Sequence, residues 1–583
     1  MTSKEFRHFK PEKVLIPETE KGGLPSEGTQ IIHDQDGRIA FCGSPHDVAQ
    51  WVNARRDEGA TFRTEEGGVL LPGLADTHYH PAIYGTLELL RPADASAVKS
   101  AGQLRNLAQE ALRERKGETH SDEPLVILNY DSSQVGSFSE LNMDEVEATQ
   151  PIFVLDRSFH SGAGNSAAMR VLDRYLEKNY SQRKQKSGAY DFPGYMKKQE
   201  IAEAFVFLAM ELAESYQSVE KVEGAIETSV ENYLAKGVTS IHEMAVMSWQ
   251  QLMAYLLLHK EWKGKHPKME FPVRQIYLTD AVVERFVREE DALVKSGLLT
   301  DDIKGILGVK LLADGSIGSR TALMDEPYLS ADQKKQHGII YNRMREAEKA
   351  LKLAARSGLD KVAVHAIGDK GIVRAIEFGR KWMEIAEKGK IDPKFRMEHF
   401  ELPQPESIRE AGEMGAWVSM QPNFGLEDIV YHDRIGNRTR LLCPHADLTN
   451  EGVPMMFGSD GMPDSMLYVI WSAMHHHDPK HRLDAISAVT AASAAAGAYE
   501  GSLRGTLQPG SQTDIVVASP ELLQVLADGR LAQDYFEQAD LPPDQRTIPI
   551  RDQVGELERR ILRVFRNGQL VHAADSEKDG KSS

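Results

Sequence analysis

Residues 68–80 read GVLLPGLADTHYH, an apolar run that ends in two histidines separated by one residue. Short apolar runs of this kind are typical of buried β-strands. Side chains two positions apart on a strand point to the same side, so His78 and His80 can reach one cation from the end of the strand. The pair alone is a common pattern, and its meaning depends on the rest of the chain.

Seven further apolar runs also end in polar residues, and helical stretches lie between them. The eight segments together are residues 68–80, 151–160, 237–244, 308–316, 361–369, 395–400, 416–423 and 454–461. Alternating strands and helices indicate parallel βαβ units, and eight units predict an α/β fold of the (β/α)8 TIM-barrel type, with its chemistry at the C-terminal strand ends. Residues 125–131 and 273–280 could also be strands, so the choice of eight rests partly on where polar residues fall.

The two chain ends are expected to form a small β-sandwich domain beside the barrel. Residues 29–43, 505–518 and 563–572 each read as strands around a turn that contains glycine. We therefore expect parts of this domain at 1–68 and 501–575, the barrel at 69–500, and a disordered tail at 576–583. Apolar residues at helical spacing within about 160–235 predict a helical insertion near the barrel mouth.

Composition excludes several classes of partner. The 583 residues include 87 acidic and 69 basic side chains, a formal charge of -18, which disfavours nucleic acid and anionic lipid. The absence of a signal-like start or of an apolar run of about 20 residues predicts no membrane span and a cytoplasmic location. Cys42 and Cys443 are the only cysteines and are far apart in the sequence, so a metal would need His, Asp, Glu or Lys ligands.

Residues able to bind a metal recur at or near the ends of the later strands: Lys310, His365, His399 and Asp460. Together with the first histidine pair they sit in the phrases LPGLADTHYHP, GVTSIHEM, VKLLADGSIGSRTA, VHAIGDKGI, RMEHFEL, SMQPNF, FGSDGMP and GTLQPGSQTDIVV. In these phrases the chain resembles the amidohydrolase superfamily, in the amidohydrolase 3 branch that includes N-substituted formamide deformylase. The resemblance spans residues 29 to 572.

The resemblance implies a role for each of these residues. His78 and His80 would bind one metal, His365 and His399 the other, Lys310 would bridge them as a carbamate, and Asp460 would complete the site. Imidazole and carboxylate ligands suit a divalent cation, Zn²⁺ above all, at one or two per chain. A lysine that stays charged in a salt bridge is the alternative for Lys310, and a structural loop residue is the alternative for Asp460.

This ligand set predicts a hydrolase that acts through metal-activated hydroxide with Asp460 as the proton shuttle. That the bond is a non-peptide C–N bond in a small-molecule substrate is implied by the resemblance alone. His160 matches a histidine that the branch places at a strand end, and it could hold the scissile group or be a core histidine. A mononuclear deaminase and an ester or lactone hydrolase remain open, as does a non-catalytic, metal-stabilised regulatory protein. A homodimer is only the default expectation.

Weaker candidates lie beside these strand ends. His242 and Glu243 could orient the metal ligands, whereas Asp314 and Arg320 are in a glycine-rich loop that could meet a substrate anion or be purely structural. The run 475–477 is three histidines that would point in different directions on a helix, and we expect them mostly at the surface.

Overall fold

The computed structural model describes residues 4–15, 28–115, 123–131, 135–138, 141–156, 159–267, 269–329, 335–427, 431–538, 541 and 550–574. The expected tail at 576–583 lies outside these ranges. In the described part of the chain, every helix is either too short or too polar to cross a bilayer.

An eight-stranded, entirely parallel sheet forms the barrel, which confirms the predicted fold class. Its strands are β7 (Leu74–Tyr79), β14 (Val238–Val246), β15 (Val273–Thr279), β16 (Leu307–Leu312), β17 (Lys361–Ala366), β18 (Lys394–His399), β19 (Trp417–Met420) and β20 (Met455–Phe457). The sheet curls until its two edges meet, where the Thr77 hydroxyl donates to the carbonyl of Phe457 at 2.8 Å. Seven of the eight strands are ones that the sequence predicts.

The remaining predicted barrel strand, residues 151–160, is wrong. Residues 151–160 do not enter the barrel, because β10 (Ile152–Asp156) pairs with β9 (Leu125–Tyr130) and β11 (Ser161–Gly164) in another sheet. The missing barrel strand is β15, in the 273–280 run, which lies between β14 and β16. Both runs are apolar and buried. Residues 151–160 are the more attractive barrel strand in sequence because they end in a histidine, whereas residues 273–280 end in threonine and aspartate.

Helices surround the barrel because each has one apolar face. On α12 (Met344–Arg356), the buried residues Ala347, Ala350, Leu351 and Ala354 follow the helical repeat and face the strands. The other helices around the barrel are α2 (Pro81–Leu90), α8 (Val219–Ala235), α9 (Trp249–Lys265), α10 (Asp280–Lys295), α11 (Asp301–Lys304), α13 (Asp369–Gly389), α14 (Pro405–Met414), α15 (Pro422–Glu427), α16 (His432–Ile435), α17 (His445–Asn450), α18 (Met466–Met474), α19 (Ala485–Ala491) and α20 (Ala494–Glu500).

The insertion is larger than expected and is not purely helical. It carries a six-stranded sheet in the order β12-β13-β11-β10-β9-β8, because its short apolar runs pair with one another rather than with the barrel. Its elements are β8 (Ala93–Asp94), α3 (Ala101–Glu114), β9, α5 (Met143–Val146), β10, β11, α6 (Ser166–Tyr180), β12 (Gly194–Lys197), β13 (Glu200–Glu203) and α7 (Ala204–Glu214). The insertion therefore begins near residue 93, and α8, which we expected inside it, packs on the barrel helices α2 and α9.

The two chain ends meet in a small domain of two β-sheets, as the sequence predicts. One sheet has the order β4-β3-β1-β5 and the other β2-β6-β21-β22-β23, so the second joins strands from both ends. Their bounds are β1 (Glu5–Lys10), β2 (Lys13–Val14), β3 (Gln30–His33), β4 (Ile39–Gly43), α1 (Pro45–Asp57), β5 (Thr61–Glu66), β6 (Val69–Pro72), β21 (Ile515–Ala518), β22 (Ile561–Arg566) and β23 (Gln569–Ala573).

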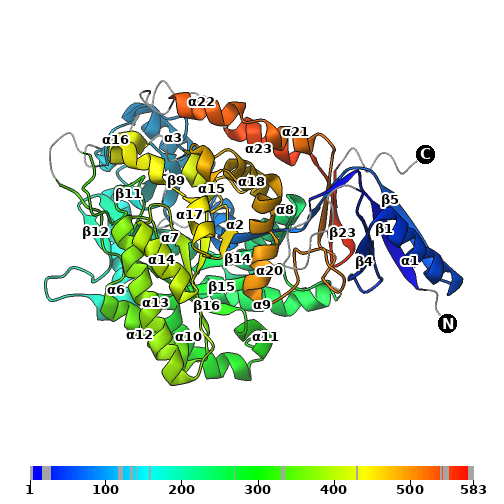
Figure 1. Cartoon of the computed structure of the whole chain (residues 1–583). Coiled ribbons are helices and arrows are strands. Elements are labelled where there is room, and N and C mark those ends of the chain that lie inside the picture. The colour runs from blue at the N-terminus through cyan, green and yellow to red at the C-terminus, as the bar shows by residue number, and fades with distance from the viewer. Residues whose placement is uncertain are drawn as a thin grey trace.

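Two details of this small domain differ from the prediction. Strand β6 pairs with β2 and β21, so the domain extends to Pro72 rather than ending at Gly68. Residues 505–518 supply one strand, β21, instead of two. In Figure 1 the domain lies at one side of the barrel, far from β11 and β12 of the insertion, and the helices α21 (Leu522–Ala527), α22 (Arg530–Gln538) and α23 (Ile550–Glu558) run along the barrel between these sides.

Candidate metal centre and active site

Six side chains from five barrel strands meet at one mouth of the barrel. They come from the C-terminal halves of the strands or from the residues that follow, and they are His78, His80, Lys310, His365, His399 and Asp460. All six line the same pocket. The sequence predicts this meeting, because parallel barrel strands present their C-terminal ends together.

His399 is at the middle of the group. The centroid of its ring lies 4.6 Å from that of His78 and 4.4 Å from that of His365. Asp460 Oδ1 lies 3.1 Å from Nε2 of His80 and 3.7 Å from Nε2 of His78. Ligand atoms of His78, His399 and Asp460 all lie within 4.8 Å of one another, a spacing that one cation can span.

The protonation states suit metal binding. Burial, followed by nearby cationic groups, holds the pKa of His78, His365 and His399 well below the ordinary value, so these imidazoles are neutral, the form in which a histidine can bind a metal. His80 behaves in the opposite way: burial acts to lower its pKa, but hydrogen bonds to the carboxylates of Asp460 and Glu243 outweigh it and raise the pKa to about 9. A divalent cation would replace the proton that these carboxylates attract.

One buried nitrogen tests whether the site fits a metal. Nδ1 of His399 is buried and has no hydrogen-bond partner among the described residues. A buried nitrogen without a partner is costly unless something binds it, and a divalent cation accepts imidazole nitrogen. The donor set of imidazoles and one carboxylate therefore fits the cation that the sequence predicts.

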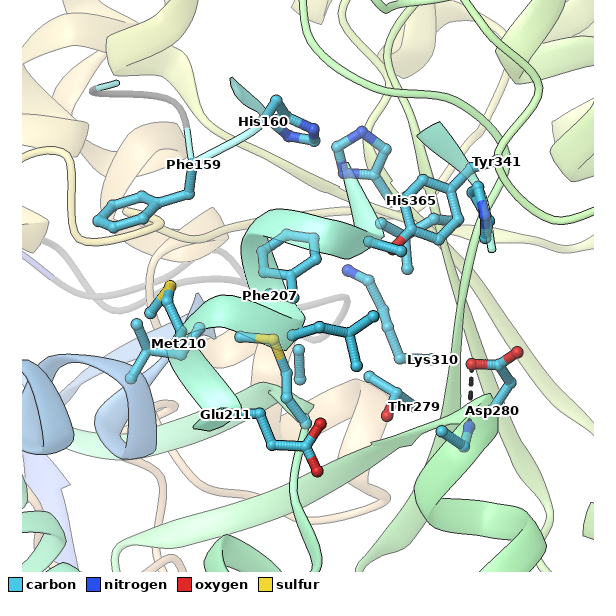
Figure 2. Close-up of a pocket in the computed structure, with 18 of the residues that line it drawn as sticks. Phe159, His160, Phe207, Met210, Glu211, Thr279, Asp280, Lys310, Tyr341 and His365 are labelled. Carbon is cyan, nitrogen blue, oxygen red and sulfur yellow. Dashed lines mark hydrogen bonds between the residues drawn. The ribbon is translucent and has the colours of Figure 1, made fainter. Parts of the chain in front are cut away.

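Lys310 has the surroundings that a neutral lysine needs. Its side chain is buried, and burial lowers its pKa from 10.5 to about 8 in spite of the carboxylates of Glu398 and Asp460. Within the described ranges, no carboxylate lies close enough to its Nζ to form an ion pair, so the salt-bridged alternative has no support there. In Figure 2 the amine of Lys310 points toward the ring of His365.

Carboxylates behind His78 and His80 fix the orientation of their rings. Nδ1 of His78 donates to Oε2 of Glu398 at 2.6 Å, and Oε1 of Glu243 lies 3.4 Å from Nδ1 of His80. Nε2 of His365 lies 3.0 Å from the carbonyl of Gly315. Such partners orient a ligand and raise its basicity.

Glu398 belongs to a buried chain of polar groups that the sequence analysis does not identify. Arg396, also fully buried, donates to both oxygens of Glu398, to the carbonyl of Thr77 and toward Nδ1 of His242. The other nitrogen of His242 faces Glu500 at 3.1 Å. His242 thus points into this chain and does not line the pocket. The arginine and glutamate at alternate positions of the phrase RMEHF are a signal that could have been found.

Asp76 is the second group that sequence reasoning missed. Its Oδ1 accepts the backbone N–H groups of His78 and Ser459, each at 3.0 Å, and its Oδ2 accepts the hydroxyls of Ser459 and Tyr233. Burial nevertheless raises its pKa to about 6. Asp76 therefore ties the histidine pair to the loop that carries Asp460, across the closing edges of the barrel.

His160 enters the pocket from the insertion and not from a barrel strand. Its Nδ1 lies 2.7 Å from Oε2 of Glu203, and its ring centroid is 5.7 Å from that of His365. Burial acts to lower the pKa of His160, but the charge of Glu203, the hydrogen bond to it and the charges of Asp156 and Asp460 together outweigh burial and raise the pKa. Glu203 is the last residue of β13 and lies at a positive φ of 57° directly before α7. Nothing local in the sequence pairs residues 43 positions apart.

Asp314 and Arg320 do not reach the pocket. Asp314 is fully buried and accepts the backbone N–H groups of Leu323, Ile367 and Gly368, so its role is to hold loops together near His365. Arg320 lies 3.9 Å from Asp433 outside the pocket. The prediction that these two residues could meet a substrate is therefore not supported, and the alternative of loop structure fits the contacts.

The three consecutive histidines are not at the surface, contrary to the prediction. His476 is fully buried, and its two neighbours are half-buried. They follow the end of α18 at Met474, and the ring centroids of His476 and His477 lie 4.2 Å apart, so these two rings do not diverge as expected. Nε2 of each of the three lies within about 3 Å of a main-chain carbonyl, of Leu526, Leu442 and Arg440 in chain order. These contacts with main-chain carbonyls hold the three histidines away from the surface.

Comparisons with known proteins agree with this geometry. Residues 66–572 match the model of the amidohydrolase family. YtcJ of Bacillus subtilis (strain 168), named as an amidohydrolase, is 23% identical over 444 residues, covering 74% of this chain and 77% of that protein. The protein LONG AFTER FAR-RED 3 of Arabidopsis thaliana is 24% identical over 541 residues, covering 86% and 85%.

Solved structures share the fold. An uncharacterized metal-dependent hydrolase from Pyrococcus horikoshii OT3 aligns with a TM-score of 0.63 and 21% identity, covering 88% of this chain and 97% of that chain. Its counterpart from Pyrococcus furiosus gives a TM-score of 0.61, also with 21% identity, covering 88% and 98%. Because the family model matches most of the sequence, and the fold and the strand-end residues agree with it, this chain belongs to the amidohydrolase family.

Proposed function

We propose that this protein is a metal-dependent hydrolase that cleaves a non-peptide, amide-type C–N bond in a small molecule. The observation that carries the proposal is the cluster around His399, where neutral imidazoles, one carboxylate and a buried unpartnered nitrogen meet at the barrel mouth. His78, His80, His365, His399 and Asp460 would hold one or two divalent cations, most simply Zn²⁺. When bound, the metal would lower the pKa of water toward about 7 and polarise the substrate carbonyl.

Lys310 is the residue we propose as the bridge between two cations. Its amine, with a pKa lowered to about 8, can add to CO2: a bond forms between Nζ and carbon, and one proton leaves. The product is a carboxylate in the middle of the ligand set. The absence of an ion-pair partner for Nζ in the described part of the chain supports this assignment over a permanent ammonium.

Asp460 is the group we propose to move the proton. Its carboxylate faces the pocket beside His80, and its backbone is fixed by the hydrogen bond from its N–H to the carbonyl of His78 and by Tyr84, whose hydroxyl donates to its carbonyl. Held there, Asp460 can accept the proton of the attacking water and return it to the leaving nitrogen. His160, oriented by Glu203, would hold the scissile carbonyl.

The test is metal analysis combined with activity. Metal is counted per chain, removed with a chelator and restored, and hydrolysis is followed against matched amides, esters and amino-substituted heterocycles. Two metals per chain and chelator-sensitive amide hydrolysis would support the proposal. Preferred cleavage of esters would make esters the substrate class, and release of ammonia from a heterocycle would make the protein a deaminase. Full activity without metal would contradict the mechanism.

A further inference from the structure

The pocket that contains the proposed centre has two unlike ends. One end holds the histidines, Lys310 and Asp460. Much of the rest is walled by apolar side chains, most of them from the insertion: Phe159, Phe192, Phe207, Leu208 and Met210, joined by Ile83 and Met247. Figure 2 shows Phe159, Phe207 and Met210 on the side opposite His365 and Tyr341. The ring of Phe207 lies 6.3 Å from that of His160, so the apolar wall begins where the proposed chemistry ends.

Apart from the centre, this pocket has one cationic side chain, and that cation is already neutralised. Arg183 Nη2 lies 3.7 Å from Oδ2 of Asp280 and 3.6 Å from Oε1 of Glu284, and its guanidinium stacks on the ring of Phe192 at 5.0 Å. Among the described lining residues, no other arginine or lysine lies outside the centre. A carboxylate on a substrate would have to compete with two protein carboxylates for the same guanidinium.

The acidic groups of the wall point to the same selectivity. Asp280, Glu211 and Glu346 line the pocket, so carboxylates outnumber guanidinium groups there. Glu211 accepts the hydroxyl of Tyr180, and Asp280 accepts the backbone N–H of Ala281. Like charges brought together in such a site cost several kcal/mol, so an anionic substituent is disfavoured wherever it lies along this wall.

The cavity volume limits the size of the apolar group. The pocket has a volume of about 180 Å³, slightly more than a cavity that takes up benzene. Apolar walls with a few polar groups at one end are typical of sites that bury a small organic ligand and orient it by that end. One ring or a short branched chain would fill the wall while the amide reaches the histidines.

We propose that the insertion selects uncharged amides: the wall around Phe207 binds one apolar group of single-ring size, and the neutralised Arg183 leaves no site for a carboxylate beside the scissile bond. This inference rests on the proposed hydrolase function for its use in turnover. It excludes N-acyl amino acids as good substrates and favours amides of simple apolar amines.

The experiment compares two substrates that differ by one carboxylate, N-acetyl-2-phenylethylamine and N-acetylphenylalanine as both enantiomers. It is run on the full-length metal-loaded protein at pH 8, above the pKa of Glu211, which burial raises to about 7. We expect kcat/KM to favour the neutral amide by about 100-fold or more. Phe207→Ala should lower kcat/KM for the neutral amide by about 10- to 100-fold, mainly through KM. Tyr195→Ala, at an exposed position on β12 of the same insertion, is the matched control and should change nothing.

Asp280→Asn tests the charge argument separately. It keeps the shape and the acceptor for the N–H of Ala281 but weakens the neutralisation of Arg183. N-acetylphenylalanine should gain by about 10-fold relative to the neutral amide. If the wild-type protein hydrolyses N-acetylphenylalanine as well as the neutral amide or better, the selectivity is wrong although the hydrolase function stands.

Binding measurements separate this inference from the proposed function. In an Asp460→Asn background, calorimetry should show N-acetyl-2-phenylethylamine binding that Phe207→Ala weakens by the same factor as its KM effect. If the neutral amide binds in a way that depends on Phe207 but the wild-type protein does not hydrolyse it, the hydrolase function is refuted and the apolar binding wall is supported. Absence of binding would overturn the inference whatever the activity.

Discussion

Replacing Glu398 by glutamine separates the stability of the barrel from its affinity for metal. The carboxylate is fully buried and accepts three hydrogen bonds, from Nε and Nη2 of Arg396 at 2.5 and 2.8 Å and from Nδ1 of His78 at 2.6 Å. Glutamine has one acceptor oxygen, and its amide N–H groups would face other donors. The buried guanidinium of Arg396 would lose its counter-charge.

The two effects have different sizes. Leaving one partner of a buried ion pair uncompensated costs about 3–5 kcal/mol, which should appear in the unfolding of the metal-free protein. Loss of the partner that orients a metal-binding histidine typically weakens metal binding about 10- to 100-fold, or about 1.4–2.8 kcal/mol. The fold effect is therefore the larger of the two, and metal-loaded Glu398→Gln should lose the sum of both.

The assay measures each quantity on its own. Thermal unfolding of the metal-free protein reports the first, and competition for Zn²⁺ with a chelator of known affinity, at a temperature where the variant is folded, reports the second. Glu377→Gln, on the exposed face of α13, is the control that changes charge without touching the chain of buried groups. A Glu398→Gln protein that binds zinc as tightly as the wild type would refute the orienting role of Glu398, whatever its stability.

Three other variants probe separate parts of the site. Asp460→Asn should keep most of its bound metal and lose at least about 100-fold in kcat, as expected when a proton acceptor is removed; near-normal turnover in a metal-loaded variant would remove Asp460 from that role. Glu203→Gln should leave the metal content unchanged and lower kcat, because His160 loses the charge that raises its pKa, and the pH profile should shift with it; an unchanged profile would make the pair structural. In Glu500, burial acts to raise the pKa, but the hydrogen bond with His242 and the charges of His242, Arg504 and Arg274 together outweigh burial and lower the pKa from 4.5 to about 2. The stability that the ionised Glu500 carboxylate contributes is fully present above pH 4.5 and is lost as pH falls through 2. Glu500→Gln should therefore flatten the dependence of the unfolding temperature on pH between these values. An equally steep slope in the variant would contradict this assignment.

The residues at the barrel mouth could be predicted because barrel geometry is periodic in sequence. Once strands alternate with helices, the residue type at the end of each strand is enough to place His365 and His399 near His78, with no knowledge of loops. The polar groups behind them follow a weaker pattern. Arg396 and Glu398 alternate on β18 toward one side, yet buried charges in a strand read from sequence as solvent-facing residues.

The one misplaced strand shows where this reasoning ends. Strand β10 and strand β15 are equally apolar, and the choice between them depended on a histidine, His160, that reaches the pocket by another route. It does so because residues of the insertion line the barrel pocket, and the pairing of β11 with β13 brings His160 and Glu203 together. Residues that reach a site through long-range packing leave no spacing in the chain, so the insertion's share of the pocket, including the wall around Phe207, is visible only in three dimensions. The part of the pocket that we propose selects the substrate is thus the part that strand counting cannot find.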